Sequence, residues 1–265
     1  MIHDEPWAAG TPAWVDLQVP DRTVAHTFYS AVLGWEFLPD SGPETGYYAM
    51  AHRGGKLIAG VGQGDQPPVW TTYLATDDVD ATVARAQGAG ATIVVPPDSI
   101  GDSGRLAVII DPLGATVGFW QSGQHTGASL VNEPGTQVWN ELRSNDLAAA
   151  KAFYGHVFGY TFDDMSGDGF EYATIAIGDA PAVGGLGGKG TLGEGETARW
   201  DTYFATDDTD ATVERAVAHG ASVVAEPSDA PYGRMATLRG PSGELFTLMS
   251  TTVQATVFDA DGGVG

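Results

Sequence analysis

The sequence contains no cysteine and few basic residues. Its 265 residues include 12 Lys and Arg against 34 Asp and Glu, which gives a formal net charge of −22. The lack of cysteine excludes disulfides, thiolate metal sites and cysteine nucleophiles. The scarcity of basic residues argues against binding to a nucleic-acid duplex, an anionic membrane or a bulky phosphate ligand, because binding to these partners requires clustered positive charge. We therefore expect neither a nucleic-acid partner nor a membrane partner.

The sequence also lacks long apolar runs and targeting signals. No stretch approaches the ~20 apolar residues that span a bilayer. The N-terminus, MIHDEPWAAG, has neither the basic region nor the apolar region of a secretory signal. We expect a globular, cytoplasmic protein. Its length fits one large domain or two of about 130 residues, since domains usually have roughly 100–200 residues.

An internal repeat organises the chain. Residues 70–83 read WTTYLATDDVDATV and residues 200–213 read WDTYFATDDTDATV, with eleven of fourteen positions identical. A match of this length indicates a duplication. The alignment that it anchors predicts four parts, which are module 1 (11–122), a linker (123–135), module 2 (136–250) and a tail (251–265).

The sequence of each module predicts strands that alternate with amphipathic helices. The first strand, 11–19, has Val15, Leu17 and Val19 on one face and Trp14 and Asp16 on the other. A helix follows from Asp21 to about Leu33, with an apolar stripe at Val24, Phe28 and Val32, and its copy has Ala149, Phe153 and Val157. In the second half of module 1, the sequence predicts a short strand at 92–95 and a loop at Pro96-Pro97. This order leaves one face of each sheet free of helices.

The ordered motifs resemble those of one family. Phe28-Tyr29 precedes Leu33-Gly34, a DDxDATV helix follows, and DPLG (111–114) forms a turn, with most of these features repeated in the second copy. In this order the chain resembles the glyoxalase/bleomycin-resistance, or vicinal oxygen chelate, superfamily, and most closely its tandem two-module actinobacterial type, which is called glyoxalase-like or hydroxylase. The resemblance implies an α+β fold of two tandem modules, each with two βαβ(β)-type units, curled mixed sheets and outer helices.

The resemblance also implies where metal ligands would lie. Metal enzymes of the family use a position three residues before a conserved Leu on each first strand, and a position near the end of each last strand. The corresponding residues here are Trp14, Gly118, Trp139 and Thr247. None is a metal-binding type, whereas a catalytic site needs at least three such ligands. We therefore predict no metal and no cofactor, with a displaced metal site as the alternative.

Alternation directs Trp14, Asp16, Trp139 and Glu141 to the helix-free faces, with Trp120 and Met249 at the corresponding positions of the last strands and four tyrosines as nearby candidates. We predict Asp16 and Glu141 as acid–base groups, with Arg143 beside Glu141 to neutralise it. The predicted ligand-binding residues are Trp14, Tyr48, Tyr73, Trp120, Trp139, Tyr172, Tyr203 and Met249. Aromatic walls and carboxylates suit a flat, partly apolar ligand.

Two functions follow from this set of residues. One is a metal-free protein that binds an aromatic or polycyclic metabolite, in resistance or in an accessory role in natural-product metabolism. The other is a lyase, isomerase or hydroxylase/oxygenase-type enzyme on the same fold, using Asp16 and Glu141 or a displaced metal. The expected partner is a small molecule, and the expected state is a monomer with both modules in one chain or a homodimer.

Overall fold

The computed structural model describes residues 1–39, 42–43 and 46–250, so the tail predicted at 251–265 lies outside the described residues. The first sheet has eight strands in the order β2-β3-β4-β1-β5-β8-β7-β6. These strands are β1 (Pro12–Val19), β2 (Glu36–Phe37), β3 (Ala49–Arg53), β4 (Lys56–Gln63), β5 (Trp70–Ala75), β6 (Thr92–Ile100), β7 (Gly104–Ile110) and β8 (Thr116–Ser122).

The second sheet repeats this topology as β10-β11-β12-β9-β13-β16-β15-β14. Its strands are β9 (Gln137–Arg143), β10 (Thr161–Asp164), β11 (Tyr172–Ala176), β12 (Gly184–Gly187), β13 (Arg199–Thr206), β14 (Ser222–Ala230), β15 (Gly233–Arg239) and β16 (Leu245–Ser250). In each sheet the first strand pairs parallel to one neighbour and antiparallel to the other. Mixed sheets in an α+β architecture confirm the predicted fold class.

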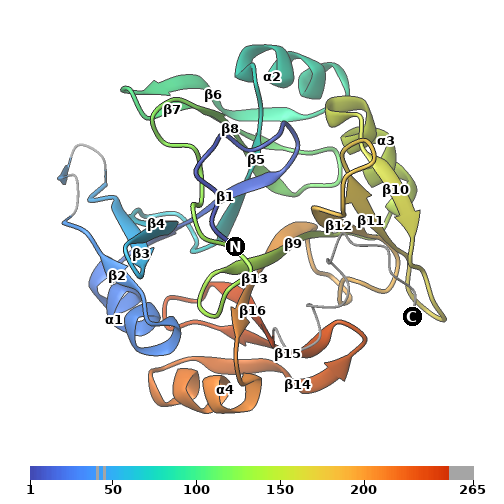
Figure 1. Ribbon diagram of the computed structural model, residues 1–265. Coiled ribbons are helices and arrows are strands. Elements are labelled where there is room, and N and C mark those ends of the chain that lie inside the picture. Colours follow the sequence, from blue (N-terminus) through green and yellow to red (C-terminus); the bar gives the residue numbers. More distant parts are fainter. Residues whose placement is uncertain (40–41, 44–45, 251–265) are drawn as a thin grey trace, which may run out of the picture.

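The described residues form four helices, which lie at the periphery of the molecule with the sheets inside (Figure 1). They are α1 (Arg22–Leu33), α2 (Val79–Gly88), α3 (Leu147–Phe158) and α4 (Thr209–Ala218). The second aspartate of the repeated ATDD stretch caps a helix in each module, because Asp78 accepts from Ala81 N and Asp208 from Ala211 N, both at 3.0 Å. No helix among these is long and apolar enough to cross a membrane.

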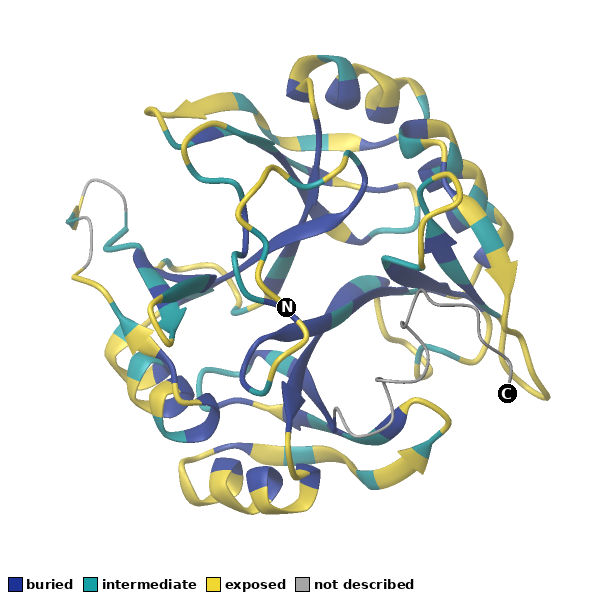
Figure 2. Ribbon diagram, in the orientation of Figure 1, coloured by how far each residue is buried: buried dark blue, intermediate teal, exposed yellow. Residues whose placement is uncertain are grey.

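The apolar cores are shared between the modules. One core combines α1 and β1, β3 and β4 with α4 and β13, β15 and β16. The other combines α2 and β5, β7 and β8 with α3 and β9, β11 and β12. Buried residues therefore concentrate on the inner strands and on the inward sides of the helices (Figure 2). Each core is therefore built from about half of module 1 and about half of module 2.

A buried polar chain crosses between the modules in each core. In the first core Trp70 Nε1 donates to Tyr29 Oη at 3.0 Å, and Tyr29 donates to Glu244 at 2.9 Å. The equivalents in the second core are Trp200, Tyr154 and Asp111, at 2.8 and 2.7 Å. The repeated Trp and the Tyr of the FY pair therefore belong to the scaffold, where they satisfy a buried carboxyl group contributed by the other module.

The predicted helix stripes were wrong at their first positions. Val24 is 42% exposed, and α1 instead buries Ala25, Phe28, Tyr29 and Val32. In α3 the buried residue is Ala150 rather than Ala149. Buried residues on these helices recur at a spacing of three and four residues, as expected for a helix with 3.6 residues per turn. A strict four-residue spacing drifts around the helix, so the first position of the predicted stripe lies off the buried face.

The loop predicted at Pro96-Pro97 was also wrong. Strand β6 continues through both prolines to Ile100, with a register shift between Val95 and Asp98 where it pairs with β7. Proline is tolerated there because β6 is the edge strand of its sheet and the shift leaves the prolines outside the ladder.

Candidate functional site

The helix-free face of each sheet gathers the predicted site residues. Cup 1 denotes the cluster of Trp14, Asp16, Tyr48, Tyr73 and Trp120, and cup 2 denotes Trp139, Glu141, Tyr172, Tyr203 and Met249. Both first strands have an irregularity in register immediately before the Trp, in β1 between Pro12 and Trp14 and in β9 between Gln137 and Trp139. Such bulges re-aim a side chain, and here they precede the indole of each cup.

Cup 1 contains a hydrogen-bonded chain that ends on a carboxyl group. Trp14 Nε1 donates to Tyr48 Oη at 2.9 Å, and Tyr48 Oη donates to Asp16 Oδ2 at 3.4 Å. Tyr73 is a further hydrogen-bond partner of Asp16. Gly60 lies opposite Asp16 on β4, and a Cβ there would overlap the Tyr48 hydroxyl. The glycine therefore makes room for the tyrosine to reach the carboxyl group.

Cup 2 repeats this chain with shorter bonds. Trp139 Nε1 donates to Tyr172 Oη at 3.0 Å, and Tyr172 donates to Glu141 Oε2 at 2.8 Å. Tyr203 donates to Glu141 Oε1 at 2.7 Å. Gly185, opposite Glu141 on β12, leaves space for the Tyr172 hydroxyl as Gly60 does for Tyr48. Both cups thus hold an indole, a phenol, a carboxyl group and a second phenol in sequence.

The electrostatics of the cups differ. Burial raises the pKa of Asp16 to about 7, although hydrogen bonds from Tyr73 and Tyr48 lower it in part. Burial and the Asp16 charge raise the pKa of Tyr48 and Tyr73 well above the ordinary tyrosine value, so both phenols remain protonated donors. No cation lies among the described partners of Asp16, and Gln18 stands where module 2 has Arg143. Cup 1 therefore holds a carboxyl group that titrates near neutrality.

Cup 2 neutralises its carboxylate with a guanidinium group, as predicted for Arg143. Arg143 Nε lies 3.2 Å from Glu141 and 2.8 Å from Asp201, and Arg199 Nε lies 2.8 Å from the other Asp201 oxygen. Arg143 Nη2 also donates to Tyr203 Oη at 2.9 Å. Burial works against its charge, but Tyr203, Glu141 and Asp201 outweigh burial and raise the pKa of Arg143. Cup 2 therefore has a fixed network of paired charges.

Segments from outside the sheet cover cup 1. The His125 ring lies 4.4 Å from the Trp14 ring and 5.1 Å from that of Trp120, between centroids, and Trp120 Nε1 donates to His125 O at 2.9 Å. Burial lowers the pKa of His125 to about 4, so this ring is neutral at pH 7. Trp7 donates to Ala128 O at 3.2 Å and holds the N-terminal segment over the same residues. The segment predicted as a linker is thus packed against the cup.

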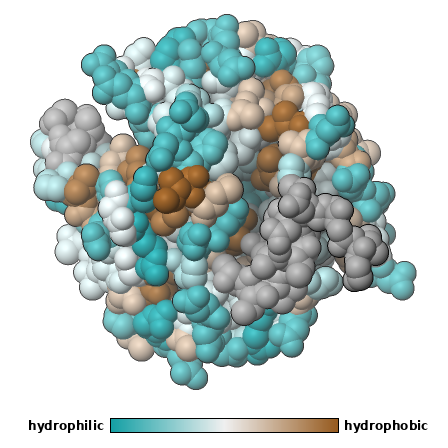
Figure 3. All heavy atoms as spheres, viewed as in Figure 1, coloured by the Kyte–Doolittle hydropathy of each residue, from teal (hydrophilic) through white to brown (hydrophobic). Residues whose placement is uncertain are grey.

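The two cups also differ in exposure. Trp14 is 3% exposed and Trp120 is 6% exposed, whereas Trp139 is only partly buried. Trp139 is therefore the more accessible of the two equivalent indoles. The N-terminus lies near the centre of the face seen in Figure 1, and apolar residues gather near the centre of the same face in the space-filling view (Figure 3).

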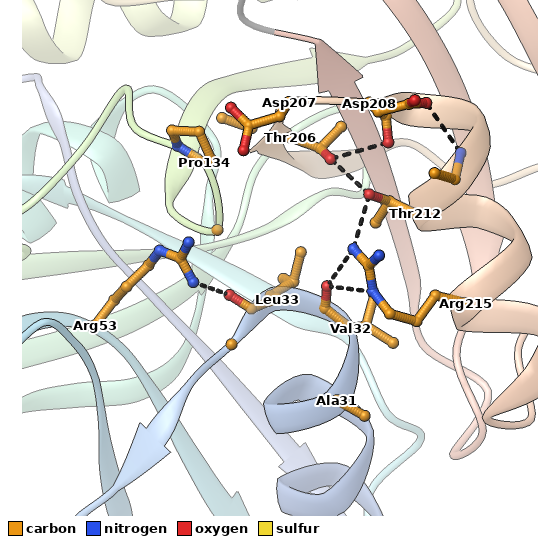
Figure 4. Close-up of a pocket in the computed structure, with 14 residues that line it drawn as sticks. Ala31, Val32, Leu33, Arg53, Pro134, Thr206, Asp207, Asp208, Thr212 and Arg215 are labelled. Carbon is orange, nitrogen blue, oxygen red and sulfur yellow. Dashed lines mark hydrogen bonds between the residues drawn. The ribbon is translucent and has the colours of Figure 1, made fainter.

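A cavity of about 340 Å³ lies between the end of α1 and the start of α4. Two guanidinium groups converge there on α1 (Figure 4), with Arg53 donating to Leu33 O at 2.6 Å and Arg215 donating to Val32 O at 3.1 and 3.3 Å. Cations at the carbonyl end of a helix stabilise it. Arg215 therefore joins α4 of module 2 to α1, whereas Arg53 stabilises the end of α1 from within module 1.

A second cavity, of about 290 Å³, lies where the modules meet. Its walls come from the N-terminal segment, the start of β1, the segment after Ala128, the start of β9 and the loop before β12. Trp139 contributes to this junction pocket as well as to cup 2.

Comparison with known families identifies the fold and its repeat. The family model described as Glyoxalase/Bleomycin resistance protein/Dioxygenase superfamily matches residues 11–119 and 136–248. The chain belongs to this superfamily. The resemblance predicted from the ordered motifs is confirmed, and with it the tandem glyoxalase-like organisation.

Sequence similarity to relatives within the superfamily extends over nearly the whole chain. A protein named "Putative glyoxylase CFP32", from Mycobacterium tuberculosis and M. bovis, is 42% identical over 92% of this chain and 96% of its own length. Anthracycline biosynthesis protein DnrV from Streptomyces peucetius is 36% identical over 92% of this chain and 94% of its own. The Mn(II)-bound glyoxalase from Novosphingobium aromaticivorans has a similar fold, with a TM-score of 0.65 at 17% identity over 92% of this chain and 82% of that one.

The metal-binding positions implied by the superfamily do not fit a metal in this chain. Trp14 and Trp139 direct their indoles to phenols. A Cβ on Gly118 would overlap the Tyr73 ring, so the tyrosine fills the space that a ligating side chain would need. Thr247 shares a hydrogen bond of 3.0 Å with Thr237. Among the described residues, no three His, Cys, Asp or Glu side chains lie close enough together to hold a metal ion.

Some features of the cups escaped sequence reasoning. The roles of Gly60 and Gly185 could have been found, since both align in the repeat and each pairs across from a cup carboxyl group. The ion pairs of Asp201 depend on β13 lying beside β9, and its counterpart in module 1 is Thr71, so the repeat gave no signal. His125 lies in the segment predicted as a linker, and the sequence of this segment has no alternation from which its facing could be predicted.

Proposed function

We propose that this protein binds a small aromatic or polycyclic metabolite without a metal ion, in a resistance or accessory role in natural-product metabolism, and that the ligand lies in cup 2. The observation that carries this proposal is the hydrogen-bonded chain Trp139–Tyr172–Glu141–Tyr203, which places a partly exposed indole beside bonded phenol and carboxyl groups. Such a surface offers a flat ring a stacking partner worth about 0.5–1.5 kcal/mol beyond burial.

The contents of cup 1 support the same chemistry. The neutral His125 ring packs edge-on to Trp14 and tilted against Trp120, so a planar heteroaromatic ring already fits a cup of this composition. Met249 replaces Trp120 in cup 2, and a flexible thioether beside Trp139 adapts to rings of differing outline. The name of the relative DnrV, which refers to anthracycline biosynthesis, favours a polycyclic ligand.

The test is calorimetric titration with 1,8-dihydroxyanthraquinone in the presence of a metal chelator. We expect micromolar affinity that the chelator does not change. Trp139→Leu should weaken binding about tenfold, and the matched variant Trp14→Leu, in the covered cup, should leave the affinity within twofold. Equal losses in both variants would contradict cup 2 as the site, and binding that disappears with the chelator would contradict a metal-free mode.

One observation favours catalysis as a second function. Asp16 titrates at about pH 7 in an apolar setting, which suits a general acid or base at neutral pH. Because the segment around His125 covers Asp16, turnover there requires this segment to move. The discriminating experiment incubates the protein with the bound compound and analyses the products by mass spectrometry. A product formed by the wild-type chain and absent with Asp16→Asn would establish the enzyme, whereas unchanged compound would leave the binding role alone.

A further inference from the structure

The junction pocket has a composition unlike that of the rest of this acidic chain. None of the side chains that line it is ionisable. Met1 also lines the pocket, but its ammonium group is already paired, 2.8 Å from Glu133 and 2.6 Å from Val131 O. An ion inside this cavity would lose its hydration without a partner, which is unfavourable. The pocket therefore selects uncharged ligands.

The apolar walls suit a flat molecule. Trp7 comes from the N-terminal segment and Trp139 from β9, and two prolines, two alanines and three valines supply half of the lining. The indole nitrogens do not compete for the ligand, because Trp7 Nε1 donates to Ala128 O and Trp139 Nε1 donates to Tyr172 Oη. The volume of about 290 Å³ lies at the lower end of ligand cavities, which fits about two fused rings.

One polar side chain in the wall has a hydrogen-bond donor to offer. Asn140 is 3% exposed, and its Oδ1 accepts from Thr72 at 3.0 Å and from Thr202 at 3.2 Å. These bonds fix the amide, and Nδ2 donates to no described protein group. Gln137, in the same wall, donates to Pro12 O at 3.1 Å and has a buried Oε1 without a partner. A ligand with a carbonyl oxygen would satisfy the Asn140 donor.

We propose that the junction pocket, which shares Trp139 with cup 2 but none of its other residues, is a second ligand site for an uncharged, flat compound of about two fused rings that carries a carbonyl oxygen. The site does not depend on cup 2 binding a ligand. It joins three segments that are distant in the chain, namely the N-terminal segment, β9 and the loop before β12. Occupancy would therefore hold these segments together at the boundary between the modules.

The test uses coumarin, which is bicyclic, uncharged and bears a carbonyl group, with coumarin-3-carboxylate as its charged analogue. By calorimetry or ligand-observed NMR of the full chain, coumarin should bind at least tenfold more tightly than the carboxylate. Ala182→Phe fills the pocket from a partly exposed loop and should weaken coumarin binding at least tenfold. Ala218→Phe, which adds the same ring at the exposed end of α4, should leave it within twofold.

Two further measurements separate this site from cup 2. Trp7→Leu removes a wall from the N-terminal segment and should also weaken coumarin, which keeps the test informative if Ala182→Phe fails to fold. Ala182→Phe should leave 1,8-dihydroxyanthraquinone binding unchanged. Coumarin binding that survives both pocket variants, or that is lost instead in Tyr203→Phe, would overturn the junction site. If both compounds respond to Ala182→Phe, the junction site stands and cup 2 fails as the anthraquinone site.

Discussion

Replacing Asp16 should change how the stability of this protein depends on pH. The folded chain raises the pKa of Asp16 from 3.8 to about 7 because the carboxyl group is buried. The folded state therefore binds this proton more tightly than the unfolded state does. Below pH 3.8 both states are protonated and burial carries no electrostatic cost. As the pH rises toward 7 the unfolded state ionises first, so the free energy of unfolding falls, and above about pH 7 the loss is constant.

The magnitude follows from the size of the shift. A displacement of about 3 pKa units corresponds to about 4 kcal/mol when fully developed, at about 1.4 kcal/mol per unit. Between pH 5 and pH 8 the wild-type chain should lose about 2–3 kcal/mol from this group. Asp16→Asn cannot titrate and should lack this part of the pH dependence. Asp16→Leu should lack it too, even though its baseline stability will differ because it forfeits the hydrogen bonds with Tyr48 and Tyr73.

The assay is urea unfolding at half-unit steps from pH 5 to pH 8, with the free energy of unfolding extrapolated to water. The informative quantity is the difference between variant and wild type at each pH, because the titration of all other groups cancels. The difference should grow by about 2–3 kcal/mol in favour of both variants across this range. A difference that stays constant would show that Asp16 is ionised in the folded protein, and it would refute the reasoning that burial in cup 1 raises the pKa of Asp16.

Three further changes test the scaffold and the cup, each by urea unfolding against the wild-type chain. Tyr154→Phe removes the hydroxyl that joins Trp200 to Asp111 and should lower the free energy of unfolding by about 1–3 kcal/mol; no change would show that this chain is dispensable. Arg85→Met should lower the free energy of unfolding by about 1–2 kcal/mol, which is more than Arg215→Met should. The reason is that Arg85 alone among the described arginines donates to the end of α3, whereas the end of α1 accepts from both Arg215 and Arg53. Equal losses in the two variants would contradict this. Gly60→Ala should cost about 1–3 kcal/mol, since its Cβ meets the Tyr48 hydroxyl, and Tyr48→Phe in the same chain should relieve part of this loss; no relief would mean that the clash lies elsewhere.

The fold followed from the sequence because the repeat supplied its own alignment. The aspartates of ATDD, the FY pair and the alternation of the first strands each predicted an element that the structure contains. The failures occurred where tertiary context outweighs local pattern. Pro96-Pro97 reads as a loop in isolation, yet an edge strand with a register shift accommodates both residues.

The positions of the cup carboxyl groups and the pairing of Arg143 with Glu141 followed from the sequence, but the rest of the cup electrostatics did not. Asp16 and Glu141 occupy equivalent positions, and the sequence predicted the same role for both. The difference arises from Arg143 and from Asp201, a residue of a strand that lies beside β9 only in the folded chain. Contacts between residues about 60 positions apart leave no local signature, so the ion pair of Arg143 with Asp201 and its bond with Tyr203 required the structure.

The shared cores distribute evolutionary freedom unevenly along the chain. A substitution at a core position such as Tyr29 or Glu244 must suit a residue of the other copy, so these positions can change only in concert. The polar groups of the cups bond mainly within their own copy, as Glu141 does with Tyr172 and Tyr203. Once the two copies occupied one chain, each cup could acquire mutations without disturbing the joint foundation. The covalent duplication thus allows the two cups to diverge on a framework that both copies build together.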